Sequence, residues 1–280
     1  KIASQLKRPA KIHVKVDTGM GRIGLPPEQA VPFIKRASQL RNIQLEGVFT
    51  HYSTADEADQ TYLLKQEKCF CQVVEELRKE NVHIPILHCS NSAAAIERPQ
   101  KVYNMIRLGI SLYGFYPSDE VNRKAVSLEP VLRLVSKVVQ VKKPPKGTGI
   151  SYGKTYVASG EEWIATVPIG YADGIDRHLS NTGYALVNGV RVPIVGRVCM
   201  DFLMLDVTNA YPVQVGDEVV FYGVQGTEAI HVDEVAKQLR TINYELVCRL
   251  GHRIPRIYRS HGKTIAVVNR LRQENVNTYR

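Results

Sequence analysis

The sequence predicts an α/β protein in which a parallel strand–helix layer is followed by a mostly β domain. Two observations predict this order. Before about residue 125, apolar strand-like runs alternate with segments of helical periodicity, which is typical of a parallel sheet. After it, short alternating strands follow one another with one helix among them. A chain of 280 residues is long enough for two domains, and we place them at 1–124 and 125–280.

The first part reads as four strand–helix units, in the form of a half-barrel or an open layer. Strands are expected over 11–17, 45–53, 84–90 and 104–114, and helices over 26–40, 56–80 and 91–97. The first helix opens with two prolines, which suit a first helical turn. In the long second helix the apolar residues recur at helical spacing: Leu63, Phe70, Val73, Val74 and Leu77.

The second part reads as a series of short strands. They are expected over 132–142, 161–174, 184–198, 201–207 and 217–223. Asn188 and Gly189 form a typical two-residue hairpin turn inside the third of these. A helix over 233–239 begins at Asp233, a residue type that caps helices. The segment 117–130 is the expected linker.

Composition excludes several classes of function. No apolar run approaches the roughly 18 residues that span a bilayer, so we expect no membrane segment. The net charge is +10, but the basic residues are scattered, which favours attraction of an anionic small molecule over nucleic-acid binding. The five cysteines are odd in number and lack metal-site spacing: Cys69, Cys71, Cys89, Cys199 and Cys248. We expect no metal and a reduced, cytoplasmic chain.

Polar residues lie at the expected strands of the first part, whose carboxyl ends are where parallel α/β layers gather their functional groups. The first strand delivers Asp17, the Gly19–Gly21 turn and Arg22, the second ends in His51, the third leads to Asn91 and Ser92, and the fourth contains Arg107 followed by Gly109. Ser92 at a helix N-terminus favours an anion, and Gly109 lets a backbone N–H approach it. The sequence therefore predicts a phosphate-bearing ligand between two arginines and a histidine.

Each position also has a plainer interpretation. Ser92 can serve only as a helix cap, and His51 can be a hydrogen-bonded histidine near the core. Arg107 is harder to explain structurally, because a guanidinium in an apolar strand is costly unless it is paired. The prediction of a phosphate-bearing ligand rests on polar residues at all four expected strands and not on any single position.

Lys15 poses a separate question. Strand alternation places His13, Lys15 and Asp17 on one face, and Arg22 can return toward it. A lysine beside an arginine loses its proton more readily, and the uncharged amine can take up carbon dioxide as a carbamate. The alternative is a solvated lysine at the strand end.

Three loops of the second part are candidates. Tyr152 lies between small residues in GISYGKTY, which presents a phenol rather than burying it. A phenol with a pKa near 10 is a poor base unless cations lower that pKa. Tyr171 in PIGYADG and Met200 in GRVCMD lie in similar turn-flanked clusters. Ordinary β-domain loops remain the alternative for each.

Together these segments closely resemble the alanine racemases, a pyridoxal-phosphate (PLP) family. The resemblance runs in order from about residue 10 to residue 258 and is carried by HVKVDTGMGRIG, GVFTHYSTADE, HCSNSAA, NMIRLGISLYG, ISYGKTY, PIGYADG, GRVCMD and TINYE…RIPRIY. It implies part of a TIM-type barrel followed by a β domain, in a homodimer with shared active sites. The implied reaction interconverts L- and D-alanine and feeds cell-wall peptidoglycan synthesis.

The resemblance also implies roles for the cofactor-binding residues. Arg107 would meet the pyridine nitrogen of PLP, and Arg22 its phenolic oxygen and the substrate carboxylate. Ser92 and the backbone of Gly109 and Ile110 would hold the phosphate.

The remaining roles implied by the family concern catalysis and the substrate. Tyr152 would be the base that acts on the L-amino acid, reaching the PLP of the partner subunit. His51 would lie between Tyr152 and Arg107 in a hydrogen-bonded chain. Tyr171 and Met200 would line the substrate pocket, and Lys15 matches the position that some members carbamylate.

Two features depart from the family. Its second base is a lysine that also anchors PLP, in a KANAYGHG-like motif that does not occur here. The chain lacks about four of the eight barrel strands, so we expect it to be inactive alone and the missing segment to lie outside it or on another chain. His252 stands where some members place a phosphate-binding tyrosine. A racemase of serine and a non-catalytic PLP-binding homologue are the alternatives.

Overall fold

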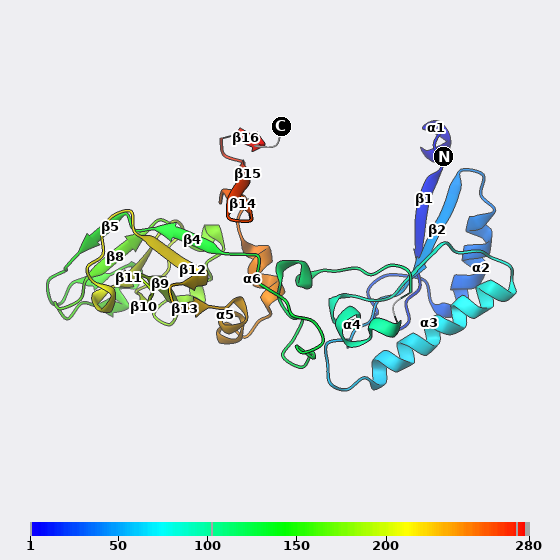
Figure 1. Cartoon of the computed structure of the whole chain (residues 1–280), viewed down its shortest axis with the longest axis horizontal. Helices are drawn as coiled ribbons and strands as arrows, with labels where there is room; N and C mark the ends of the chain where they lie inside the picture. The colour runs from blue at the N-terminus through cyan, green and yellow to red at the C-terminus, as the bar shows by residue number, and fades with distance from the viewer. Residues whose placement is uncertain (1, 102, 273, 278–280) are drawn as a thin grey trace. The chain divides into compact units, whose positions relative to one another are not determined.

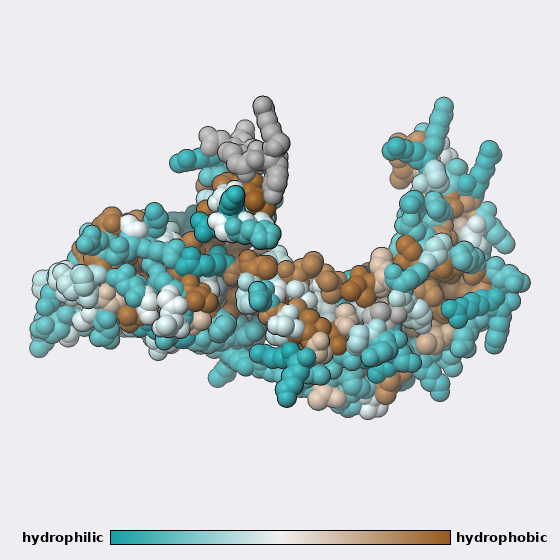
Figure 2. All heavy atoms as spheres, in the orientation of Figure 1, coloured by the Kyte–Doolittle hydropathy of each residue, from teal (hydrophilic) through white to brown (hydrophobic). Residues whose placement is uncertain are grey.

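The computed structural model describes residues 2–101, 103–272 and 274–277 and divides the chain into two compact units, Lys1–Val131 and Leu132–Arg280 (Figure 1). The first mixes helices with a parallel sheet and the second is mostly β, as predicted. The domain boundary between residues 124 and 125 stays a prediction. Hydrophilic residues cover much of the face drawn in Figure 2, interrupted by smaller apolar patches.

The first unit is built on three parallel strands in the order β1-β2-β3. The strands are β1 Ala10–Lys15, β2 Ile43–Phe49 and β3 Ile86–His88. The helices are α1 Ile2–Gln5, α2 Pro27–Ser38, α3 Thr61–Lys79 and α4 Ser92–Glu97, with the 3₁₀ turns η1 Pro99–Lys101 and η2 Ile110–Tyr113. The predicted apolar stripe of α3 is buried, because its residues pack on the strands in one hydrophobic cluster.

The expected fourth strand over 104–114 is wrong. Only η2 forms in this stretch, and Ile106 and Leu108 are each 42% exposed. The N–H of Gly109 donates to the Ser92 hydroxyl at 2.9 Å, so it is not available for a strand ladder. A side chain that binds backbone N–H groups competes with regular structure, and the apolar periodicity could not show this.

The expected linker packs on the first unit. Val121 lies in its hydrophobic cluster, and the Ser118 hydroxyl donates to the carbonyl of Asp56 at 2.5 Å. The segment therefore has fixed tertiary contacts within that unit.

The second unit contains an eight-stranded sheet in the order β13-β12-β9-β10-β11-β8-β5, with β4 also on β12. Its strands are β4 Leu134–Lys137, β5 Gln140–Lys142, β8 Ile164–Val167, β9 Tyr184–Val187, β10 Val190–Val195, β11 Leu203–Asp206, β12 Glu218–Gln225 and β13 Glu228–Ile230. Two small sheets pair β6 Gly149–Ile150 with β7 Tyr156–Val157, and β14 Arg256–Ser260 with β15 Lys263–Asn269 and β16 Glu274–Asn277. The helices are α5 Val232–Gln238 and α6 Asn243–Arg249, and the 3₁₀ turns are η3 Tyr152–Lys154, η4 Tyr171–Asp173, η5 Arg177–Leu179 and η6 Thr208–Ala210.

The expected single strand over 132–142 is divided into β4 and β5. The reason is a change of partner: β4 pairs with β12, whereas β5 pairs with β8. Val138 lies between them, buried, with its N–H bonded to the Asp217 carbonyl. The chain therefore crosses from one neighbour to another at that residue.

Two local predictions in the second unit have opposite outcomes. The hairpin turn is confirmed, because Asn188 and Gly189 have φ values of 51° and 75° and connect β9 to β10. The cap at Asp233 is wrong. The N-cap of α5 is His231, and the Asp233 carboxylate instead accepts from the Asn243 side chain on α6 at 2.7 Å.

None of the helices in the part of the chain that the structure describes is long and apolar enough to cross a membrane.

Candidate active site

The candidate site of the first unit lies at the carboxyl ends of its parallel strands. Lys15 is the last residue of β1, His51 follows β2 by two residues, and His88 is the last residue of β3. Ser92 begins α4, and Arg107 returns to the same place, with its N–H donating to the carbonyl of Ser90. The predicted gathering of polar side chains at these strand ends is therefore observed within this unit.

Arg107 is the centre of this cluster. One terminal nitrogen donates to Nδ1 of His88 at 2.6 Å. The other donates to the carbonyl of Thr50 at 2.9 Å, to Nδ1 of His51 at 3.0 Å and to the carbonyl of Cys89 at 3.1 Å. Carbonyls and imidazoles thus hold the guanidinium, and no ion pair with a carboxylate is found for it among the described residues. Its positive charge is therefore not neutralised there.

The two histidines beside Arg107 are neutral near pH 7. Burial, followed by the charge of Arg107, lowers the pKa of His51 to about 4 and that of His88 to about 4. A guanidinium can only donate hydrogen bonds, so both Nδ1 atoms accept. Each ring therefore carries its proton on Nε2.

We expect the free energy of unfolding to fall as the pH is lowered from about 6.5 to about 4. His88 is buried and binds its proton near pH 4 when folded, but near pH 6.5 when unfolded. The unfolded state therefore holds more protons in this window, and acidification should cost on the order of 1–3 kcal/mol. Urea unfolding at several pH values measures it. The exposed His83 supplies a control, since H83Q should keep the slope, and a flat profile in the parent protein would contradict the prediction.

Lys15 is not the solvated lysine of the alternative interpretation. Its side chain is 8% exposed, and its Nζ is buried with no hydrogen-bond partner among the described residues. Burial, followed by the charge of Arg22, lowers its pKa. Asp17 does not pair with it, because that carboxylate accepts from the N–H groups of Gly19 and Gly21 at 3.0 and 3.1 Å. Carbamylation of Lys15 stays a prediction.

Ser92 is not the cap of α4, so the plainer interpretation of this residue is wrong. The cap is Asn91, whose side-chain oxygen accepts from the N–H of Ala94 at 2.9 Å. The buried Ser92 hydroxyl accepts instead from the N–H groups of Gly109 and Ser111 at 2.9 and 3.4 Å. A Cβ placed on Gly109 would contact only that hydroxyl, at 3.8 Å, so the space beside its backbone is open.

Gln66 is a positioning residue that the sequence reasoning missed. Its side chain is 0% exposed on α3. Its amide nitrogen donates to the His51 carbonyl at 3.1 Å, and its oxygen accepts from the N–H and hydroxyl of Ser53 at 3.0 Å each. The sequence did contain a signal for this role, because Gln66 lies in the otherwise apolar stripe of α3, where a buried amide needs hydrogen-bond partners.

Replacing Gln66 with methionine should lower the free energy of unfolding by about 1–3 kcal/mol, because the half-buried His51 carbonyl and Ser53 N–H lose their partners. Urea denaturation measures the loss. The control is Q72M, at an exposed position of the same helix, which should change stability by less than about 0.5 kcal/mol. If Q66M and Q72M lowered the free energy of unfolding equally, the hydrogen bonds of Gln66 would not stabilise the loop of His51 and Ser53.

The candidate residues of the second unit lie on loops that contact one another. The N–H of Tyr171 donates to the carbonyl of Cys199 at 3.0 Å, and a Cβ on Gly170 would lie 2.2 Å from the same oxygen. The Ser151 hydroxyl donates to the carbonyl of Arg197 at 2.6 Å, which fixes the loop before Tyr152. The structure thus brings together the loops of Tyr152, Tyr171 and Met200 within this unit. Their roles stay predictions.

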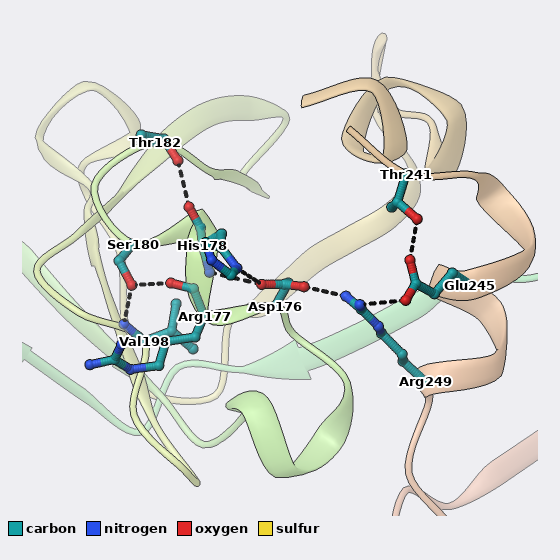
Figure 3. A network of polar contacts seen from close by, with 9 residues as sticks. All are labelled: Asp176, Arg177, His178, Ser180, Thr182, Val198, Thr241, Glu245 and Arg249. Atoms are coloured by element: carbon teal, nitrogen blue, oxygen red, sulfur yellow. Dashed lines mark hydrogen bonds and ion pairs between the residues drawn. The ribbon is translucent and has the colours of Figure 1, made fainter. Parts of the chain in front are cut away.

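A polar network supports these loops from α6 (Figure 3). Asp176 lies between His178 and Arg249 and binds both, and Arg249 also pairs with Glu245 on α6. On the other side of η5, the Ser180 hydroxyl accepts from the N–H of Val198 at 3.0 Å. The network therefore links α6 to the loop that carries Met200.

Arg253 and Asp173 form a second support that the sequence reasoning missed. Two guanidinium nitrogens of Arg253 bind the buried Asp173 carboxylate at 2.6 and 2.9 Å. The same arginine binds Asp201 at 2.7 Å, next to Met200. His252 is exposed and its Nδ1 lies 3.2 Å from the Arg270 guanidinium. Its part in phosphate binding stays a prediction.

Comparisons with known proteins agree with this arrangement. Residues 1–117 match the family described as the alanine racemase N-terminal domain, and residues 131–258 match the alanine racemase C-terminal domain. The alanine racemase of Halothermothrix orenii is 49% identical over 261 residues, which are 93% of this chain and 68% of that relative. That of Methanococcus maripaludis is 48% identical over 92% of this chain and 69% of its own length.

Solved structures of alanine racemases have the same fold as this chain. The alanine racemase of Clostridium difficile 630 gives a TM-score of 0.92 at 41% identity, covering 96% of this chain and 70% of that one. The alanine racemase of Bacillus anthracis with bound L-Ala-P gives 0.89 at 42% identity, covering 95% and 69%. The predicted order of a partial barrel and a β-rich part is confirmed by these matches.

Proposed function

The chain belongs to the alanine racemase family, and we propose that it supplies the PLP- and substrate-binding part of an isomerase that interconverts L- and D-alanine. The observation that carries the proposal is the Arg107 guanidinium, fixed between two neutral histidines with its charge not neutralised. The alanine racemases of Halothermothrix orenii, Methanococcus maripaludis and Clostridium novyi are longer than this chain, which spans 68–70% of their length.

The residues of the first unit fit PLP. Arg107 would meet the pyridine nitrogen, and Arg22 the phenolic oxygen and the substrate carboxylate. Ser92 and the backbone of Gly109 and Ile110 would hold the phosphate. Two buried polar atoms without partners among the described residues, Nζ of Lys15 and the Ser111 hydroxyl oxygen, support a polar or anionic occupant here.

Racemisation removes the α-proton from one face of the substrate and returns a proton to the other. PLP, when bound, disperses the negative charge left on the carbon. We propose that Tyr152 of the partner subunit takes the proton from L-alanine. Because His51 carries its proton on Nε2, it can donate a hydrogen bond to the deprotonated phenol and so stabilise the form of Tyr152 that acts as the base. The opposite face needs a second base, the lysine of the family motif that this sequence does not contain.

The surroundings of the reaction are proposed on the same basis. Tyr171 and Met200 would line the pocket for the small substrate in a homodimer with shared sites. The five cysteines are all free, which supports a reducing, cytoplasmic location. The D-alanine formed would enter cell-wall peptidoglycan synthesis.

Incubating the purified full-length gene product with PLP and L-alanine tests the function. D-alanine, measured with a D-amino-acid oxidase, is the expected product, and L-serine under the same conditions should react more slowly. Faster formation of D-serine would establish the serine racemase alternative. A visible band of bound PLP that borohydride removes, without turnover of either substrate, would instead show a non-catalytic binder.

A further inference from the structure

We propose that His13 and Glu46 are positioning residues that, through His88, fix the Arg107 guanidinium in the candidate active site. The side chains of Arg107, His88, His13 and Glu46 form a continuous series of hydrogen bonds across the three strands. Nδ1 of His88 lies 2.6 Å from Arg107, Nε2 of His88 lies 2.8 Å from Nδ1 of His13, and Nε2 of His13 lies 3.2 Å from the Glu46 carboxylate. The inference rests on the proposed role of Arg107.

The donors and acceptors in this series of hydrogen bonds allow only one arrangement, in which each bond is donated from the Arg107 side toward Glu46. The guanidinium can only donate, so Nδ1 of His88 accepts and its proton is on Nε2. That N–H donates to Nδ1 of His13, whose own proton is then on Nε2. An ionised carboxylate can only accept, and the Glu46 carboxylate accepts from this last N–H. A cation at one end and an anion at the other therefore fix both tautomers, and both end bonds are charge-assisted.

The local structure of β1 and β2 leaves room for the His13 side chain in this series of hydrogen bonds. A register shift between Ile12 and His13 places His13 opposite Gly47 on β2. A Cβ on Gly47 would lie 2.4 Å from Nδ1 of His13, so only glycine leaves room for the imidazole to cross β2 toward β3. The Phe49 ring stacks on His88 with centroids 4.6 Å apart, and the Arg107 guanidinium carbon lies 5.3 Å from the same ring. The packing thus holds His88 and Arg107 together.

Losing Glu46 should disturb Arg107 even though the two do not touch. Without the Glu46 acceptor, the Nε2–H form of His13 loses a charge-assisted hydrogen bond, so its Nδ1–H form becomes more populated. Two N–H donors would then face each other between His13 and His88, which lie 2.8 Å apart. His88 must turn away, and Arg107 loses the contact of one terminal nitrogen.

The test compares the full-length protein with E46L, E46Q and K11M. Lys11 binds the other oxygen of the same carboxylate, at 2.7 Å, so K11M is a matched control that leaves the bond to His13. Two-dimensional ¹H–¹⁵N spectra of the histidine side chains, recorded without PLP, report the tautomers. His13 and His88 should both carry Nε2–H in the parent and in K11M. In E46L, His13 should populate the Nδ1–H form, and E46Q, which keeps an acceptor oxygen, should restore part of the original tautomer.

The second readout is kinetic. With PLP bound, E46L should lower kcat for alanine about 5- to 20-fold with KM within twofold, whereas K11M should change kcat by less than twofold. Unchanged tautomers and kcat in E46L, or an equal loss in K11M, would overturn the proposal. Because the tautomers are read without cofactor or substrate, a protein that shows them but does not racemise alanine would refute the proposed function and leave this chain of bonds standing. A protein that racemises alanine but does not show these tautomers would refute only the proposed series of hydrogen bonds.

Discussion

Replacing Tyr152 with phenylalanine should lower the rate of alanine racemisation by about 10²–10⁴-fold, the usual contribution of a general acid–base group. The stability should hardly change. Tyr152 is 72% exposed, and its phenol makes no hydrogen bond to the residues that the structure describes. Its removal should therefore shift the free energy of unfolding by less than about 0.5 kcal/mol. This contrast separates a catalytic phenol from a structural one.

Exchange of the substrate α-proton with deuterated water gives the sharper measurement. Because the proposed mechanism assigns L-alanine to Tyr152 and D-alanine to the second base, Y152F should lose exchange into L-alanine and retain it into D-alanine. Y184F is the matched control, since Tyr184 is a half-exposed tyrosine of the same unit, on β9. Equal loss of exchange for both enantiomers would contradict the assignment of Tyr152.

The features that the sequence predicted correctly depend on neighbours along the chain. The helical spacing from Leu63 to Leu77 identified the buried stripe of α3, and Asn188–Gly189 identified the hairpin. The meeting of His51 and Arg107 was also expected from the rule that parallel strands gather polar residues at their carboxyl ends, although Arg107 lies on a loop and not on the expected fourth strand. Each of these needs only a local pattern and one topological rule.

The features that it missed depend on contacts between distant segments. The apolar run at 104–114 looks like a strand, but Ser92 takes the Gly109 N–H that a ladder would need. Gln66 interrupts an apolar stripe only because its amide is satisfied by His51 and Ser53. His13 was placed on a face with Lys15, but its bonds to His88 and Glu46 follow from a register shift. Periodicity does not encode such pairings.

Replacing Arg107 with leucine should have the largest effect on the first unit. The carbonyls of Thr50 and Cys89 lose a donor, and His88 loses the partner of its Nδ1. Unsatisfied buried acceptors of this kind should lower the free energy of unfolding by about 2–4 kcal/mol. Racemisation should fall by at least about 10²-fold, because an electrostatic contact to the reacting system is lost.

The decisive measurement for R107L is the titration of His51 and His88, the two histidines beside Arg107. In the parent, burial and the charge of Arg107 hold the pKa of His51 and that of His88 at about 4. Removing the cation removes the repulsion but not the burial, so both pKa values should rise part of the way toward 6.5 in R107L. NMR titration of the ring protons measures them, and R41L, at an exposed position, should leave them near 4. If both pKa values stayed near 4 in R107L, burial alone would keep these histidines neutral, and Arg107 would have no electrostatic hold on His51 through which to tune Tyr152.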